Sequence, residues 1–265
     1  MLIEDLIKVP DAAIVNSILP KQDIFNETGM NRSDKDYFVR YIKQIRWLYK
    51  FDDASVRIKP YETEDKSYLE AELISIKLKK EFQEYNHNTG NYHRFDARLD
   101  RIVDILLRFI PYPILLCAEF NDEIKFYVSH ISESKLDYDK ITLDELINTE
   151  WINTKEMDNF DLELIDKLQI GNLDKTNVYT FYDDIVTAII QYNGSKEVGQ
   201  SVSLTKEEIQ QIMDKIKSIE REISNLKIKI RRANNFNEKV ELNIKINGLE
   251  EEIKNLQGEL KHEGI

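Results

Sequence analysis

The chain has 265 residues with a formal net charge of −12, and 42% of its residues are hydrophobic. This composition provides enough apolar side chains for a folded core, and eight glycines and five prolines are too few for long disordered tracts. No apolar run approaches the roughly 18 residues that a membrane-spanning helix requires. A single cysteine, Cys117, excludes an intramolecular disulfide, and the N-terminal stretch is acidic where an export signal would be basic. We therefore expect a cytoplasmic protein.

The negative charge is concentrated in the first three-quarters of the chain. Residues 1–203 hold 25 Lys and Arg against 37 Asp and Glu, a net charge of −12, whereas residues 204–262 hold 12 against 11, a net charge of +1. Because an acidic surface repels phosphate, this balance argues against nonspecific nucleic-acid binding over the whole protein. Any contact with nucleic acid would have to be local.

Helical and strand patterns alternate along the first 192 residues. Helical spacing predicts a short helix at 10–15, an amphipathic helix over 33–50, a helix from Phe95 to Phe109, short helices at 143–147 and 162–168, and a clearer one at 176–192. Alternating apolar residues predict strands at 56–59, 68–79, 114–120 and 124–128. The last two form a hairpin around Asn121-Asp122. This order predicts an α+β body with one mixed β-sheet flanked by helices.

The last quarter of the chain carries the strongest pattern. Apolar residues recur at alternating steps of three and four, which is the spacing of a coiled-coil seam, at Ile209, Ile212, Ile216, Ile219, Ile223, Leu226 and Ile230, and again at Leu242, Ile246, Leu249, Ile253, Leu256 and Leu260. Only a turn fits between these two runs. We therefore expect an α+β body over 1–192, a linker over 193–203 and an antiparallel coiled-coil hairpin over 204–262.

Further apolar residues lie off the hairpin seam, namely Met213, Ile228, Val240 and Ile244. A hairpin of two helices buries one seam per helix, so these residues need another contact. We expect the arm to dock on the body, on a second copy or on a partner chain.

The sequence carries no glycine-rich phosphate loop and no serine-hydrolase motif, and we predict no catalytic residue, cofactor or metal site. Asp96, Asp100 and Asp104 could bind a divalent cation, but nearby arginines favour a solvated charged face. His87 and His93, with Asp96, could hold a transition metal, although their spacing matches no standard motif.

One strand keeps an enzymatic alternative open. A metal-dependent nuclease needs two carboxylates on adjacent strands and a lysine beside the second. The predicted strand 68–79 offers Glu70, Glu72, Lys77 and Lys79 but no Glu-x-Lys. The order of helices and strands is compatible with such a nuclease, whereas structural strand charges are the simpler interpretation.

Cations cluster at the expected tip of the hairpin, on either side of its turn, at Lys227, Lys229, Arg231, Arg232 and Lys239. A basic tip on a long arm could contact nucleic acid. The simpler interpretation is that cations at the end of a helix complement its dipole, worth about 0.3–1 kcal/mol each.

The turn has a structural interpretation of its own. Asn235 or Asn237 can cap the second helix, and Phe236 can close the apolar end of the turn. Asn243 falls where the heptad expects an apolar residue, and a polar residue in a seam fixes its register.

Several segments resemble the bacterial domain-of-unknown-function family 4391: Pro20-Lys21, residues 47–50, residues 110–115, Trp151 and, most specifically, residues 236–243. This resemblance implies a gene near helicase and DNA-methyltransferase genes in restriction or antiphage cassettes, and hence an accessory role. We expect a non-enzymatic adaptor that holds such an assembly together through its arm, with a helicase or methyltransferase as partner. The alternative is a nucleic-acid-binding subunit or a diverged metal-dependent nuclease subunit.

Overall fold

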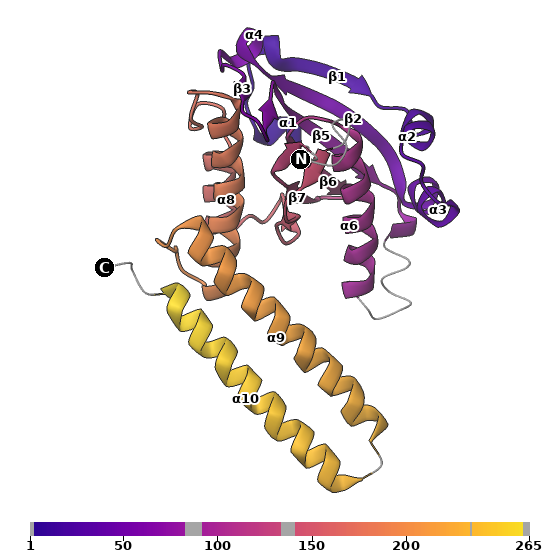
Figure 1. The fold of residues 1–265 in the computed structure, drawn as a ribbon, viewed down its shortest axis with the longest axis vertical. Helices are drawn as coiled ribbons and strands as arrows, with labels where there is room; N and C mark the ends of the chain where they lie inside the picture. Colours follow the sequence, from indigo (N-terminus) through magenta and orange to yellow (C-terminus); the bar gives the residue numbers. More distant parts are fainter. Residues whose placement is uncertain (1–2, 83–91, 134–140, 234, 262–265) are drawn as a thin grey trace. The chain divides into compact units, whose positions relative to one another are not determined.

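The computed structural model describes residues 3–82, 92–133, 141–233 and 235–261; at 92–96, 133 and 141 it describes the backbone alone. The chain divides into two compact units, residues 1–189 and 190–265. The first unit contains the β-sheet and the second the C-terminal helical hairpin (Figure 1).

A seven-stranded mixed sheet forms the centre of the first unit. Its order is β1-β2-β5-β6-β7-β10, and β11 also pairs with β7. The strands are β1 (Ile14–Ile18), β2 (Ile42–Phe51), β5 (Ala71–Leu78), β6 (Ile114–Phe120), β7 (Glu123–Val128), β10 (Ile147–Asn148) and β11 (Ile152–Asn153). β5 and β6 run parallel, and the other paired neighbours are antiparallel. The predicted α+β fold with a mixed sheet and a C-terminal helical hairpin is confirmed.

Smaller elements surround this sheet. Two ribbons pair β3 (Tyr61–Glu62) with β4 (Ser67–Tyr68), and β8 (Ile131–Glu133) with β9 (Ile141–Leu143). The helices of this unit whose bounds the described residues give are α1 (Ile3–Leu6), the 3-10 helix η1 (Asp11–Ala13), α2 (Lys21–Glu27), α3 (Arg32–Tyr41), α4 (Asp53–Val56), α6 (Tyr92–Phe109) and α7 (Asn159–Lys167). Helix α8 (Val178–Val198) crosses the boundary between the units.

The parallel pair β5–β6 explains the position of α6. Parallel neighbours require a crossover connection, and α6 supplies it. The buried stripe of α6 packs into a core with one face of the sheet, which contributes Ile74 and Ile76 from β5 and Leu116 and Ala118 from β6. Alternate residues of the same strands point to the opposite face. α8 lies on the other side of the sheet from α6 (Figure 1), where Phe51 of β2 packs against Phe181 at 5.5 Å between ring centroids.

The prediction of one helix over 33–50 is wrong, because α3 ends at Tyr41 and β2 follows directly. β2 carries two irregularities in its pairing with β5, at Lys43 and at Leu48, each of which inserts an extra residue. Buried residues therefore fall at Ile42, Ile45 and Leu48. These three-residue steps imitate the spacing of a helix.

Three shorter predictions are also wrong. The segment 10–15 forms only the turn η1 before β1, residues 53–56 form a helix where a strand was expected at 56–59, and 143–147 lies between the ends of β9 and β10. In contrast, the strands over 68–79, 114–120 and 124–128 and the helices before Pro111, at 162–168 and at 176–192 are found. Asn121, with φ of 54°, makes the predicted turn between β6 and β7.

The second unit contains the hairpin of α9 (Lys206–Arg232) and α10 (Phe236–Lys261). The side chains of Thr205 and Glu208 form a reciprocal capping box at the start of α9. Six of the seven predicted seam residues of α9 are buried, and Ile230 is half-buried. On α10, Ile246, Leu256 and Leu260 are buried, whereas Leu242, Leu249 and Ile253 are half-buried.

The boundary between body and hairpin differs from the expected one. α8 continues to Val198, so the first six residues of the expected linker are helical, and the chain divides after Ile189. Gly194 in this helix lies against α9, because a Cβ atom there would stand 2.8 Å from a side-chain atom of Ile209. Gly199, with φ of 69°, follows the helix in the left-handed region.

The turn between α9 and α10 is capped as expected, because the Asn237 backbone N–H donates to the side-chain oxygen of Asn235. Two expectations about this segment are wrong. Phe236 is 76% exposed and does not close the turn. Asn243 is exposed and donates to the Lys239 carbonyl, so it does not lie in the seam.

Candidate functional site

The best candidate site on the body lies at the carboxyl ends of the parallel strands β5 and β6. Ser75 and Lys77 project from one face of β5, and Lys77 is the register partner of Glu119 on β6. The Ser75 hydroxyl donates to Glu119 Oε1 at 2.6 Å, and Lys77 Nζ lies 3.7 Å from Glu119 Oε2. Among the described residues, Oε2 accepts no hydrogen bond. The three side chains therefore form one polar group on this face of the sheet.

Burial makes this group electrostatically unusual. The side chain of Glu119 is 7% exposed, and burial raises its pKa, while the hydrogen bond from Ser75 and the charge of Lys77 act in the opposite direction. Perturbed carboxylates at the carboxyl ends of parallel strands are common at ligand sites. This position makes the group the part of the sheet best suited to chemistry.

Two further residues complete what we call the ion cluster (Glu4, Arg46, Ser75, Lys77 and Glu119). Arg46 of β2 is the register partner of Ser75, and its guanidinium lies 2.9 Å from Glu4 of α1. Arg46 also donates to the side chain of Asn16. Two carboxylates thus face two cations, so the formal charges of the cluster balance. In the part of the chain that the structure describes, no group of three or more His, Cys, Asp or Glu side chains could hold a metal ion.

The strand charges singled out from the sequence do not form one site, although Glu70 and Glu72 interact with each other. Glu72 and Lys77 are five residues apart on a regular strand, so they point to opposite faces. Glu70 pairs with Lys50 at 2.6 Å, and Lys79 Nζ donates to the Val39 carbonyl. Burial, followed by the charge of Glu70, raises the pKa of Glu72 to about 7.

Sequence reasoning missed Ser75 and Glu119. The available signal was weak: a Ser-x-Lys on one strand, and a glutamate near the end of the apolar run that forms the next strand. Their contact depends on the parallel register of β5 and β6, which the sequence does not specify.

The predicted aspartate and histidine positions lie partly outside the described residues. His87 lies outside them, and so do the side chains of His93 and Asp96. Asp104 pairs with Arg101 and with Arg108, three residues before it and four after it, at 3.1 and 2.9 Å. These pairs agree with a charged helix face.

A second polar network, also missed from the sequence, centres on His130. Its Nδ1 lies 3.0 Å from the Tyr68 hydroxyl and its Nε2 lies 3.0 Å from Asp183 Oδ1. The Tyr68 hydroxyl also accepts from the Ile131 N–H and contacts the Ile131 carbonyl, and its side chain is fully buried. Because the hydroxyl is enclosed and already bonded, we interpret this network as one that fixes β4 against β8.

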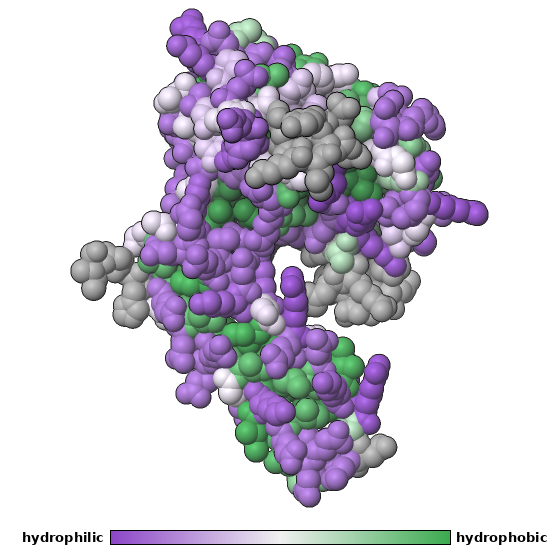
Figure 2. Space-filling model, viewed as in Figure 1, coloured by the Kyte–Doolittle hydropathy of each residue, from purple (hydrophilic) through white to green (hydrophobic). Residues whose placement is uncertain are grey.

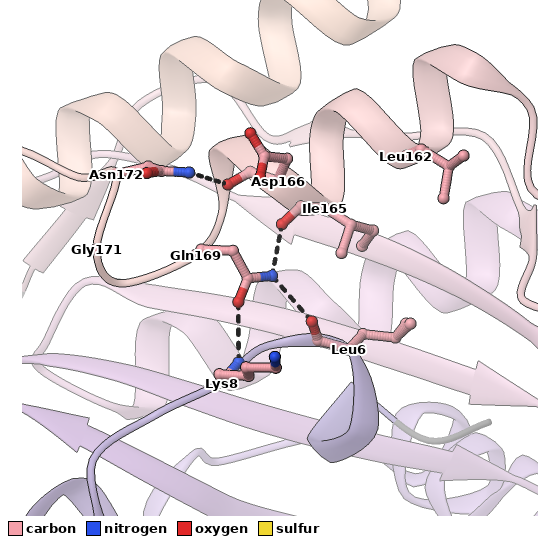
Figure 3. A pocket seen from close by; sticks show the side chains of 8 residues that line it. All are labelled: Leu6, Lys8, Leu162, Ile165, Asp166, Gln169, Gly171 and Asn172. Atoms are coloured by element: carbon pink, nitrogen blue, oxygen red, sulfur yellow. Dashed lines mark hydrogen bonds between the residues drawn. The ribbon is translucent and has the colours of Figure 1, made fainter.

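A hollow of about 600 Å³ lies between α7 and the N-terminal segment (Figure 3). Gln169 stands at its centre, donates to the carbonyls of Leu6 and Ile165, and accepts from the Lys8 N–H. The amide thus uses both its oxygen and its nitrogen to tie the N-terminal segment to α7. Because the amide is engaged in these contacts, we interpret the hollow as structural.

The predicted basic residues occupy the hairpin tip, which we define as residues 227–245. Lys229, Arg231 and Arg232 are exposed in the last turns of α9. Lys227 lies 3.7 Å from Glu250 on α10, and Lys239 is half-buried. Four of the five predicted cations are therefore exposed, and one of these four, Lys227, lies within ion-pair distance of a glutamate.

The same tip exposes large apolar side chains. Within the described residues nine large hydrophobic side chains are exposed, and four of them lie between positions 228 and 244. Their exposed fractions are 42% for Ile228, 76% for Phe236, 40% for Val240 and 65% for Ile244. Met213, the remaining off-seam residue, is half-buried. Figure 2 shows hydrophobic residues at the surface of the hairpin, among hydrophilic ones.

The chain belongs to the family described as a domain of unknown function (DUF4391), whose family model matches residues 7–253. The resemblance seen in the sequence is thereby confirmed. No curated protein and no solved structure matches the chain. Within the described residues, none of the helices combines the length and the apolar character needed to cross a membrane.

Proposed function

We propose that the protein is a cytoplasmic, non-enzymatic adaptor that uses its hairpin as a coiled-coil arm to hold a partner subunit. The partner would be a helicase or methyltransferase of a bacterial restriction or antiphage defence assembly, as the family resemblance implies. The observation that carries the proposal is the exposure of four large apolar side chains at the hairpin tip.

Energetics support a partner at this position. Fully burying a Val, Leu, Ile or Phe side chain is worth about 1.5–3 kcal/mol relative to leaving it exposed. Single exposed apolar residues are common on protein surfaces, but four within 17 residues (228–244) are concentrated. Such concentrations mark interaction sites. The seam is already occupied by the opposite helix, so a partner would be needed to cover these side chains.

The body supports the same proposal less directly. The charges of the ion cluster balance one another, and the amide in the hollow of Figure 3 is already bonded on both sides. Neither arrangement leaves a pair of free carboxylates or an activated nucleophile.

Co-expression with candidate helicase and methyltransferase subunits, the partners that the family resemblance implies, tests the proposal. The double variant Ile216→Asp/Ile219→Asp places two charges in the buried seam and should disrupt the hairpin. Ser218→Asp, at an exposed position between them, is the matched control. We expect a tagged wild-type chain and the control to co-purify a subunit, and the seam variant to lose it. Retention of the subunit by the seam variant would contradict the adaptor role.

A diverged metal-dependent nuclease subunit is the second candidate. Ser75, Lys77 and Glu119 at the carboxyl ends of β5 and β6 would be its reaction site, with Glu119 as the only carboxylate of the three. Plasmid incubated with the pure protein and Mg²⁺ or Mn²⁺ tests it. A nuclease would lose cleavage on Glu119→Gln, whereas Glu72→Ala, on the opposite face of β5, would retain it. That pair of results would replace the adaptor proposal.

A further inference from the structure

The exposed residues of α10 form a continuous apolar stripe, which we define as Phe236, Val240 and Ile244. Residues four apart lie on one face of a helix. Val240 and Ile244 each stand two residues from the seam residue Leu242, which turns them by about 200° around the helix axis. The stripe therefore faces away from α9. Eight residues separate its ends, so it runs for about 12 Å.

The charge around the stripe is opposite in sign to that of the rest of the protein. The hairpin tip (227–245) holds six Lys and Arg against two Glu, a net charge of +4. Since the whole chain has a net charge of −12, the residues outside the tip together have a net charge of −16. Four of the six cations lie on α9, and Lys239 and Lys245 lie on α10 with the stripe. A partner of the stripe therefore meets a tip of net positive charge. Charge complementarity favours a partner surface that is both acidic and apolar.

A second copy of the hairpin fits this surface poorly. Tip against tip would bring together two segments of net charge +4, which repel. The proximal half of the hairpin (206–226 with 246–261) holds six Lys and Arg against nine Asp and Glu, a net charge of −3, so its charge is complementary. However, within the described residues that half exposes no large hydrophobic side chain. The stripe would then pack on charged residues such as Glu251 and Glu252.

Nucleic acid accounts for only part of the surface. The exposed ring of Phe236, with Arg231 and Arg232 a few residues before it in the sequence, would suit stacking on a base with contacts to phosphate. Val240 and Ile244 continue the stripe away from the turn, and their aliphatic side chains offer nothing to phosphates or base edges. A protein helix would use the whole stripe, because amphipathic helices are recognised through apolar anchors at three- and four-residue spacing.

We infer that the hairpin tip binds an acidic amphipathic helix of the partner subunit, which packs along Phe236, Val240 and Ile244 as a third helix. This inference rests on the adaptor function proposed above. The apolar residues of that helix cover the stripe, and its acidic residues complement the net charge of +4 of the hairpin tip.

A synthetic helical peptide tests this recognition on the full-length chain. The probe is a fluorescent 21-residue peptide with leucines at three- and four-residue spacing and glutamates elsewhere, and the matched control carries lysines in place of the glutamates. Fluorescence anisotropy should show binding of the acidic peptide only, weakened at least tenfold by Ile244→Asp or Val240→Asp and unchanged by Ser218→Asp. Equal binding of both peptides, binding of neither, or an unchanged affinity of Ile244→Asp would overturn the inference.

The other occupants give separate outcomes in the same experiment. A 20-nucleotide single strand that binds more tightly than the acidic peptide, and is released by Ile244→Asp, would overturn the inference in favour of nucleic acid. Sedimentation that shows a dimer dissociated by Ile244→Asp would overturn it in favour of a second copy. Because Ile244 is 65% exposed, its replacement should leave the hairpin folded, and circular dichroism checks this.

The co-expression experiment separates this inference from the proposed function. Loss of the subunit from both Ile244→Asp and the seam variant supports the adaptor function and recognition through the stripe. Loss from the seam variant alone leaves the adaptor function standing and refutes recognition through the stripe. Retention of the subunit by both variants refutes both.

Discussion

Replacing Glu72 by Gln should stabilise the body at neutral pH and have little effect near pH 4.5. The residue is 5% exposed, and burial, followed by repulsion from Glu70, raises its pKa from its ordinary value of 4.5 to about 7. A carboxyl with a raised pKa binds its proton more tightly in the folded chain than in the unfolded chain. The stability that Glu72 gains from this tighter proton binding is therefore fully present below pH 4.5 and is lost as the pH rises to about 7. The difference between the two pKa values corresponds to about 3 kcal/mol of unfolding free energy.

Urea denaturation of the wild type and of Glu72→Gln at pH 4.5 and pH 7.5 measures this effect. The stability advantage of the variant should grow from near zero at the lower pH to at most about 3 kcal/mol at the higher pH. Glu123→Gln, at an exposed position on β7 of the same sheet, is the control for the substitution itself. An advantage of Glu72→Gln that is equal at both pH values would refute the argument from burial.

Two further predictions concern packing and buried hydrogen bonds. Ile216→Ala, which truncates a seam residue 1% exposed, should lower the unfolding free energy of the hairpin by about 2–5 kcal/mol, whereas Ile228→Ala, 42% exposed, should lower it by less than about 1 kcal/mol. Denaturation followed by circular dichroism compares them, and equal losses would contradict the assigned seam. Tyr182→Phe removes a buried hydroxyl that donates to the Ile114 carbonyl and accepts from the Ser129 N–H, and should cost about 1–3 kcal/mol. Unchanged thermal unfolding would contradict that role.

The hairpin could be predicted from the sequence because its signal is local. Alternating steps of three and four residues determine which face of each helix is buried. The six seam residues of α9 from Ile209 to Leu226 are buried, as that pattern requires. The same pattern placed Ile228, Val240 and Ile244 off the seam, and all three are exposed.

The error at β2 shows where local periodicity fails. The bulges at Lys43 and Leu48 shift the alternation of the strand, so its buried residues acquire helical spacing. Nothing within the segment distinguishes this from an amphipathic helix. The distinction comes from the pairing of β2 with β1 and β5, which is a property of the whole sheet.

The candidate site on the body could not be predicted for a related reason. Ser75 and Glu119 are 44 residues apart in the sequence, and the crossover helix α6 separates their strands. Their hydrogen bond depends on the register of a parallel pair. In the sequence, Glu119 is only the polar end of an apolar run.

Site-specific photo-crosslinking in cells tests the central claim, that a partner covers the outward stripe of α10. Benzoylphenylalanine would replace Ile244 in one chain and Glu252, an exposed residue of the same helix, in another. Each chain would be co-expressed with the helicase and methyltransferase subunits proposed as partners. We predict a cross-link to one of these subunits from position 244 and none from position 252. Cross-linking from neither position, or from position 252 alone, would contradict the claim.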